Sequence, residues 1–184
     1  MRKATLFTMF VVLAGVFCGG KTGSQANKPA ASAAKWPAEA TDPLTEDELA
    51  QFVIALPAFS AALKAANWTP VLPQDSGGPV ATLTSYVEQM NVPGLEEALK
   101  PAGSSWGAVR PTLYKVFAAL AALNIDAAPP EMVAQMRADT SAGAKKSLED
   151  YEAVKAACSQ IPEANQQMVT SHKQELQALQ TLGQ

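Results

Sequence analysis

The chain has 184 residues, of which 14 are basic and 17 are acidic, so its net charge is −3. Because binding to nucleic acids depends on basic contacts to phosphate, this acidic balance predicts no nucleic-acid partner. Alanine is abundant and only 7% of the residues are aromatic. Since alanine has the highest helix propensity, the composition favours an all-α fold.

The first eighteen residues have the pattern of an export signal. Arg2 and Lys3 precede an apolar run over 6–17, and Cys18 opens a polar stretch of small residues. A charged start followed by a short apolar core is typical of a secretory signal peptide. The run is also shorter than the roughly 20 residues that a membrane-spanning helix needs.

Residues 1–18 resemble a bacterial lipoprotein signal, in which the cysteine becomes the lipid-modified first residue after cleavage. The resemblance implies that Cys18 carries a lipid anchor and that the protein lies on the periplasmic side of the cell envelope, as an outer-membrane lipoprotein. The family places a small residue before the cysteine, where this chain has Phe17. The alternative is ordinary cleavage near Gly20, or after Ser24-Gln25-Ala26, which would yield a soluble exported protein.

Two segments follow the signal. Residues 19–43 are rich in Gly, Ser, Pro and Lys and poor in residues to bury, so they predict a disordered tether, with Trp36 packing on the edge of the domain. Residues 44–184 predict a single helical domain. With the leader's two basic residues removed, 12 basic residues stand against 17 acidic ones, so an electrostatic hold on anionic lipid is not expected either.

Helix signals recur along the domain. Thr45 and Glu48 match a capping box that starts a helix, in which Pro57 predicts a kink or two abutting helices. Pro79 suits the first position of the next helix, and Pro111 predicts a bend or a delayed start in the most apolar one. Apolar spacing predicts the later helices over 79–90, 94–100, 106–123, 130–158 and 162–179.

The last two of these helices are long and joined by a short turn, which predicts an antiparallel helical hairpin. The expected fold is therefore a bundle of four to six helices ending in that hairpin. The runs Leu44–Leu49 and Ile161–Asn165, with Phe52, resemble segments of small exported helical proteins of unknown function from Gram-negative bacteria. This resemblance implies no residue roles.

Residues 74–79 resemble the segment around the nucleophile of trypsin-like serine proteases, with Ser76 in the place of the serine. That family is an all-β double barrel whose histidine precedes the serine in the chain. Here the single histidine, His172, lies far downstream, and a serine without a base is not an activated nucleophile. We interpret the segment as a Gly-rich turn before the helix at Pro79.

His172 lies on the apolar stripe of its helix, between Val169 and Leu176. One interpretation is an axial ligand of haem, with a methionine as the second ligand; the candidates are Met90, Met132 and Met136. The alternative, which we favour, is a half-buried histidine in the seam between helices. A single histidine excludes metal sites that need several imidazoles, and we expect no cofactor.

We interpret Cys158 and the acidic residues as structural or solvent-exposed groups. Cys158 falls on a buried stripe, where cysteine acts as a small apolar residue, although a reactive or dimerising thiol is the alternative. The acidic groups at 46–48, 96–97 and 149–152 lack EF-hand spacing, so no metal site is expected.

The sequence therefore predicts a non-enzymatic, lipid-anchored envelope protein that binds a partner protein of the envelope or has a structural role. The alternative is a periplasmic carrier that holds a small apolar ligand, or haem, in a cleft between the helices kinked at Pro57 and Pro111.

Overall fold

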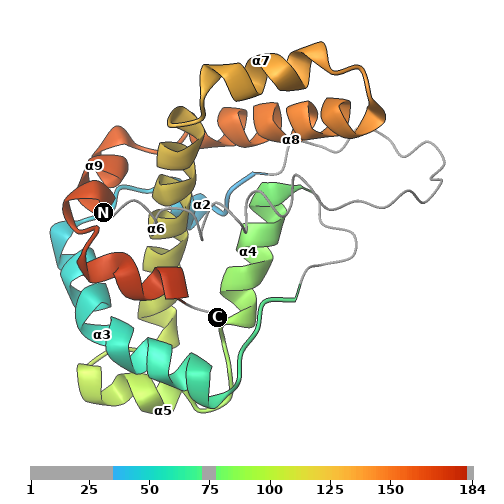
Figure 1. Ribbon diagram of the computed structural model, residues 1–184. Coiled ribbons are helices and arrows are strands. Elements are labelled where there is room, and N and C mark those ends of the chain that lie inside the picture. The colour runs from blue at the N-terminus through green and yellow to red at the C-terminus, as the bar shows by residue number, and fades with distance from the viewer. Residues whose placement is uncertain (1–34, 72–77, 182–184) are drawn as a thin grey trace, which may run out of the picture.

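The computed structural model describes residues 35–71 and 78–181 (Figure 1). These residues form helices and loops, and no strand occurs among them, so the predicted all-α class is confirmed. The leader, Cys18 and most of the predicted tether lie outside the described residues.

The packed body begins earlier in the chain than the sequence predicts. A short helix, α2 (Ala38–Thr41), lies along α6 (Trp106–Asp126), and Trp36 and Ala40 are buried in the core. Residues 36–43 fall within the predicted tether, but Trp36 and Ala40 are buried against the domain. The packing of Trp36 on the domain was predicted, whereas the short helix was not, because only one large apolar residue marks the segment.

The first long helix, α3 (Glu46–Ala65), starts as predicted. The side chain of Thr45 accepts a hydrogen bond from the backbone N–H of Glu48, and the Glu48 carboxylate accepts one from the backbone N–H of Thr45. The helix continues through Pro57 as one element. Pro57 is exposed, so water can hydrate the Val53 carbonyl, which has lost its usual helical partner.

The next elements are α4 (Pro79–Gln89), α5 (Leu95–Leu99) and a 3₁₀ turn, η1 (Lys100–Ala102). Pro79 occupies the first position of α4, as predicted. The side chain of Gln89 holds the incoming chain, because it accepts a hydrogen bond from the Val71 N–H and donates one to the Val71 carbonyl, at 2.9 and 3.0 Å.

The central element is α6, which packs against α2, α3, α4, α8 and α9. It begins at Trp106, where Ser105 caps it, so Pro111 does not delay its start. Nearly every residue from Thr112 to Ala122 is buried. The ring of Trp106 stacks on Phe59 of α3, with centroids 6.3 Å apart, which joins the two longest helices.

The last third of the chain contains α7 (Pro130–Ala138), α8 (Ala142–Cys158), α9 (Glu163–Ser171) and a 3₁₀ segment, η2 (Glu175–Thr181). A single helix was expected over 130–158, but it is divided in two. Ser141 caps α8 through the Ala144 N–H, and Asp139 accepts the N–H of Ser141 at 2.8 Å. These local hydrogen bonds compete with the helical ladder and explain the break.

As a result, α7 and α8 lie antiparallel and side by side at one end of the molecule (Figure 1). The expected final helix is also shorter than predicted, because α9 ends at Ser171 and His172 forms its C-cap.

One helix in the described part of the chain, α3, is long and apolar enough to be a membrane-spanning candidate. About 39% of its most apolar window is buried inside the protein. The pair α6 and α7 also passes the test together, but it is bent by 77°. Because core helices pass the same test, this feature is weak evidence for a membrane span.

Candidate functional site

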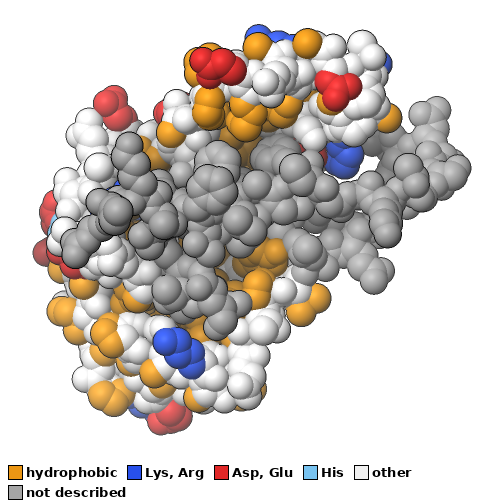
Figure 2. Space-filling view, viewed as in Figure 1, with side chains coloured by type: hydrophobic (Ala, Val, Ile, Leu, Met, Phe, Trp, Pro, Cys, Tyr) orange, Lys and Arg blue, Asp and Glu red, His pale blue; other side chains and the backbone are white. Residues whose placement is uncertain are grey.

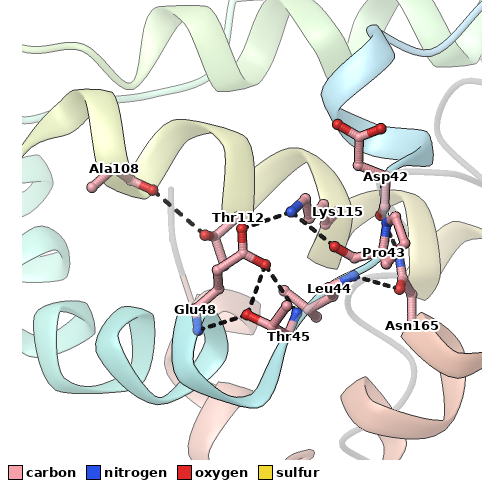
Figure 3. A network of polar contacts seen from close by, with 9 residues as sticks. All are labelled: Asp42, Pro43, Leu44, Thr45, Glu48, Ala108, Thr112, Lys115 and Asn165. Carbon is pink, nitrogen blue, oxygen red and sulfur yellow. Dashed lines mark hydrogen bonds and ion pairs between the residues drawn. The ribbon is translucent and has the colours of Figure 1, made fainter.

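A network that we call the polar clamp is built around two buried polar side chains, Lys115 and Asn165 (Figure 3). The ammonium of Lys115, on α6, donates to the Glu48 carboxylate at 2.8 Å and to the Pro43 carbonyl at 3.0 Å. Asn165, on α9, is fully buried; it accepts the N–H of Leu44 at 2.7 Å and donates to the Asp42 carbonyl at 2.9 Å.

The polar clamp holds the segment between α2 and α3 against α6 and α9. Each of its charged and amide groups has a protein partner, so the clamp supports the fold. Partial burial alone would raise the pKa of Glu48. The hydrogen bonds from Lys115 and Thr45, and the charge of Lys115, outweigh this and hold that pKa below the usual carboxyl value.

A second polar group joins α4 to α6. The Tyr114 hydroxyl donates a short hydrogen bond to Glu88, and the Arg110 guanidinium lies 3.5 Å from both Glu88 and Glu39. Burial, and then the hydrogen bond to Glu88, raise the pKa of Tyr114 above its usual value. A phenol with a raised pKa stays protonated as a donor, so this group also stabilises the packing of helices.

The candidate site is a cleft of about 730 Å³ where the end of α6 meets α7 and α8. The volume lies in the range of about 300–1,000 Å³ that is usual for ligand sites. Its wall is mainly apolar and comprises Ile125, Ala128, Pro130, Val133, Ala134 and Ala138. The cleft arises because α7 turns away from α6 by 77° and packs mainly against α8.

Charged side chains of both signs surround this apolar wall. Arg137 of α7 and Glu152 of α8 face each other at 3.7 Å, and both are more than half exposed. Lys155 and Asp126 complete the rim. The side chain of Lys155 makes no hydrogen bond or ion pair within residues 35–71 and 78–181. An apolar centre with a polar rim is the usual anatomy of a protein interface.

One wall of the cleft is held weakly. No residue of α7 is buried; Val133 and Met136 are half-buried and supply its apolar contact with the core. A helix with few buried contacts opens at a lower free energy than the core does. The cleft can therefore widen through movement of α7 without disturbing the polar clamp.

The candidates singled out in the sequence do not converge on this cleft. Cys18 and Ser76 lie outside the described residues. His172 lies near the start of α3, where its Nε2 is 3.3 Å from Glu46 and its Nδ1 is 3.8 Å from Glu175.

Both ring nitrogens of His172 thus face carboxylates. Of the methionines considered as its partners, Met90 is buried at the end of α4, and Met132 and Met136 lie on α7. The His172 nitrogens face these carboxylates, and the three methionines lie on or beside other helices, so the haem interpretation gains no support from this geometry.

Cys158 is buried at the end of α8, in keeping with the small apolar role predicted for it. Burial, together with the nearby charge of Asp126, raises the pKa of the Cys158 thiol to about 12. Within the described residues, no group of three or more His, Cys, Asp or Glu side chains is arranged to hold a metal ion.

Pro57 and Pro111, which were expected to flank a cleft, do not line this one. The sequence contained a usable signal at Pro129-Pro130, since a double proline directly after the most apolar helix predicts a sharp change of direction. Lys115 gave a second signal, because a single lysine within an apolar helical run indicates a buried, paired charge.

No protein-family model matches this chain, and comparisons with curated proteins and with solved structures find no significant match.

Proposed function

We propose that the protein is an exported, non-catalytic binding protein of the cell envelope, anchored by lipid on Cys18, that engages a partner protein through the cleft between α6, α7 and α8. The observation that carries this proposal is the combination of an open apolar wall with a rim of both charge signs. A partner that inserts an apolar side chain and pairs with the rim would match this surface.

The fold supports such a role. The polar clamp fixes the body of the protein, whereas α7 has no buried residue and packs mainly against α8. We also propose that the helices form a bundle around α6. Its antiparallel hairpin is the pair α7 and α8, and not the pairing of 130–158 with 162–179 that the sequence predicts. A tether before Trp36 would let this hairpin reach a partner at some distance from the membrane.

Site-specific photocrosslinking in intact cells tests the proposal. A photoreactive amino acid replaces Ala134, which is exposed and lines the cleft, or Ala156, which is exposed on α8 outside the cleft. We expect a discrete crosslinked partner from position 134 and none from position 156. Equal crosslinking from both positions, or none from position 134, would contradict binding through the cleft.

The second candidate function is a carrier of a small apolar or amphipathic ligand. The cleft volume favours it, and so does Lys155, a cation at the rim without a partner in the described residues. Native mass spectrometry of protein purified from its own membranes would detect such a ligand. If the protein is a carrier, Ala134→Trp, which fills the cleft, should abolish the bound mass, and Ala156→Trp should leave it in place. A bound mass that neither change affects would contradict this function.

A further inference from the structure

The face of α3 that points away from the core is unusually apolar. Ala50, Ile54, Pro57 and Ala61, which we call the α3 stripe, are all exposed, and Ile54 retains 57% of its accessible surface. No charged residue occurs in 52–63. Figure 2 shows hydrophobic side chains reaching the surface over α3, at lower left. Because a surface helix normally carries polar residues on its outer face, this stripe indicates a covered surface.

The residues of the α3 stripe are arranged nearly symmetrically about the middle of the helix. Positions 50 and 61 are both alanine and lie equally far from the middle of the helix, and Ile54 and Pro57 flank that middle. Just beyond the stripe, Asp47 and Lys64 occupy the corresponding positions with opposite charge. Their side chains make no hydrogen bond or ion pair in the described part of the chain. A two-fold interface requires this kind of self-complementary surface.

We propose that the α3 stripe binds a second copy of this chain, with the two α3 helices antiparallel. In that arrangement Lys64 of one protomer faces the partner's Asp47, and Ala50 faces the partner's Ala61. A parallel arrangement would instead bring like charges together at each end, which is unfavourable. The alanines let the two backbones approach closely, and the opposed helix dipoles favour the antiparallel direction.

The composition of α3 argues for a second copy over a membrane surface. Helices that lie on membranes combine bulky apolar residues with basic flanks. The α3 stripe consists mainly of alanine and proline, and the first turn of the helix is acidic at Glu46 and Asp47. The contact is limited to one helix face, so we expect a weak dimer, with a Kd on the order of micromolar or above. This surface is separate from the cleft, and the inference does not depend on the proposed function.

Disulfide crosslinking between two differently tagged full-length chains tests the direction of pairing. Both chains carry Cys18→Ser, which leaves only the buried Cys158; one adds Ala50→Cys and the other Ala61→Cys. The two positions are about 16 Å apart along the helix, whereas a disulfide needs Cα atoms within about 7 Å. Under mild oxidation we expect the mixture to form a mixed dimer at least tenfold more than either chain forms a homodimer.

The other outcomes overturn the proposal. Homodimers from each chain alone would indicate a parallel contact, and the absence of any crosslink would mean that no second copy covers the stripe. Binding to vesicles of phosphatidylglycerol and phosphatidylethanolamine without crosslinking would assign the surface to the membrane instead.

Charge exchange gives an independent test by sedimentation velocity on the full-length chain with Cys18→Ser. Asp47→Lys or Lys64→Asp alone should weaken the dimer at least threefold, and the two changes together should restore it. Lys145→Asp, an exposed change on α8, serves as the control and should have no effect. Circular dichroism checks that each variant is folded. Single changes without effect, or a double variant that is not restored, would refute the pairing.

Discussion

Asn165 offers the sharpest test of how the fold is held together. Its side chain is fully buried and joins α9 to the segment before α3, through hydrogen bonds of 2.7 Å with the Leu44 N–H and 2.9 Å with the Asp42 carbonyl. Asn165→Ala removes both partners at once. The N–H of Leu44, a buried residue, then has no partner, whereas Asp42 is exposed and water can replace the lost contact at its carbonyl.

The expected loss follows from these two environments. An unsatisfied buried donor costs about 1–3 kcal/mol, and the lost hydrogen bond at the exposed carbonyl adds about 1 kcal/mol. We therefore expect the free energy of unfolding to fall by about 2–4 kcal/mol. For a domain of this size, that corresponds to a Tm lower by roughly 6–12 °C.

Urea unfolding followed by circular dichroism measures this loss. Asn91→Ala is the matched control, because Asn91 is exposed and its side chain makes no hydrogen bond in the described residues. The control should change the free energy of unfolding by less than about 0.5 kcal/mol. If Asn165→Ala destabilised the protein no more than Asn91→Ala does, the polar clamp would not hold α9 to the body.

Three further predictions concern titratable side chains. The pKa of Glu48 is lowered in the folded state, so its contribution to stability is present above the unfolded pKa of about 4.5 and is lost as pH falls below it. The difference in unfolding free energy between the wild type and Glu48→Gln should therefore be largest near pH 7 and shrink below about pH 4.5. Cys158 has a pKa of about 12 and is buried, so iodoacetamide at pH 8 should modify it in urea but not in the native protein, as peptide mass spectrometry would show. His172→Ala should lower the free energy of unfolding by less than about 1 kcal/mol and leave binding intact, because its contacts with Glu46 and Glu175 lie at the surface.

Each of these predictions has a result that contradicts it. A Glu48→Gln difference independent of pH would mean that the carboxylate is not stabilised by Lys115. Modification of native Cys158 would indicate that the end of α8 opens readily. A loss of binding in His172→Ala at an unchanged Tm would give the histidine a functional role.

Local signals in the sequence were sufficient for the helices that start with a capping box or with a proline at the first position. Thr45 with Glu48, Pro79 and Pro130 each mark a start that the structure confirms. The break between α7 and α8 was missed because Asp139 and Ser141 act through short-range hydrogen bonds, which the apolar spacing across 130–158 does not record.

Contacts between distant parts of the chain could not be derived in the same way. Asn165 accepts a hydrogen bond from the Leu44 N–H, which lies more than 100 residues away in the chain. No pattern in the sequence around Asn165 predicts that partner. The cleft likewise depends on the 77° turn between α6 and α7. The spacing of apolar residues in the sequence does not determine the angle of that turn. The interpretation of Cys158 as a buried apolar residue needed only the helical stripe, and it agrees with the structure.

We propose that the chain acts in the cell envelope, held there by lipid on Cys18, and the intact mass of the exported protein tests this proposal. The protein is expressed with its own leader in a Gram-negative host and extracted from the membranes. We predict a chain that begins at Cys18 and has the added mass of acyl chains. An unmodified soluble chain that begins near Gly20 or Asn27 would contradict the anchor, and an uncleaved chain that remains in the cytoplasm would contradict export altogether.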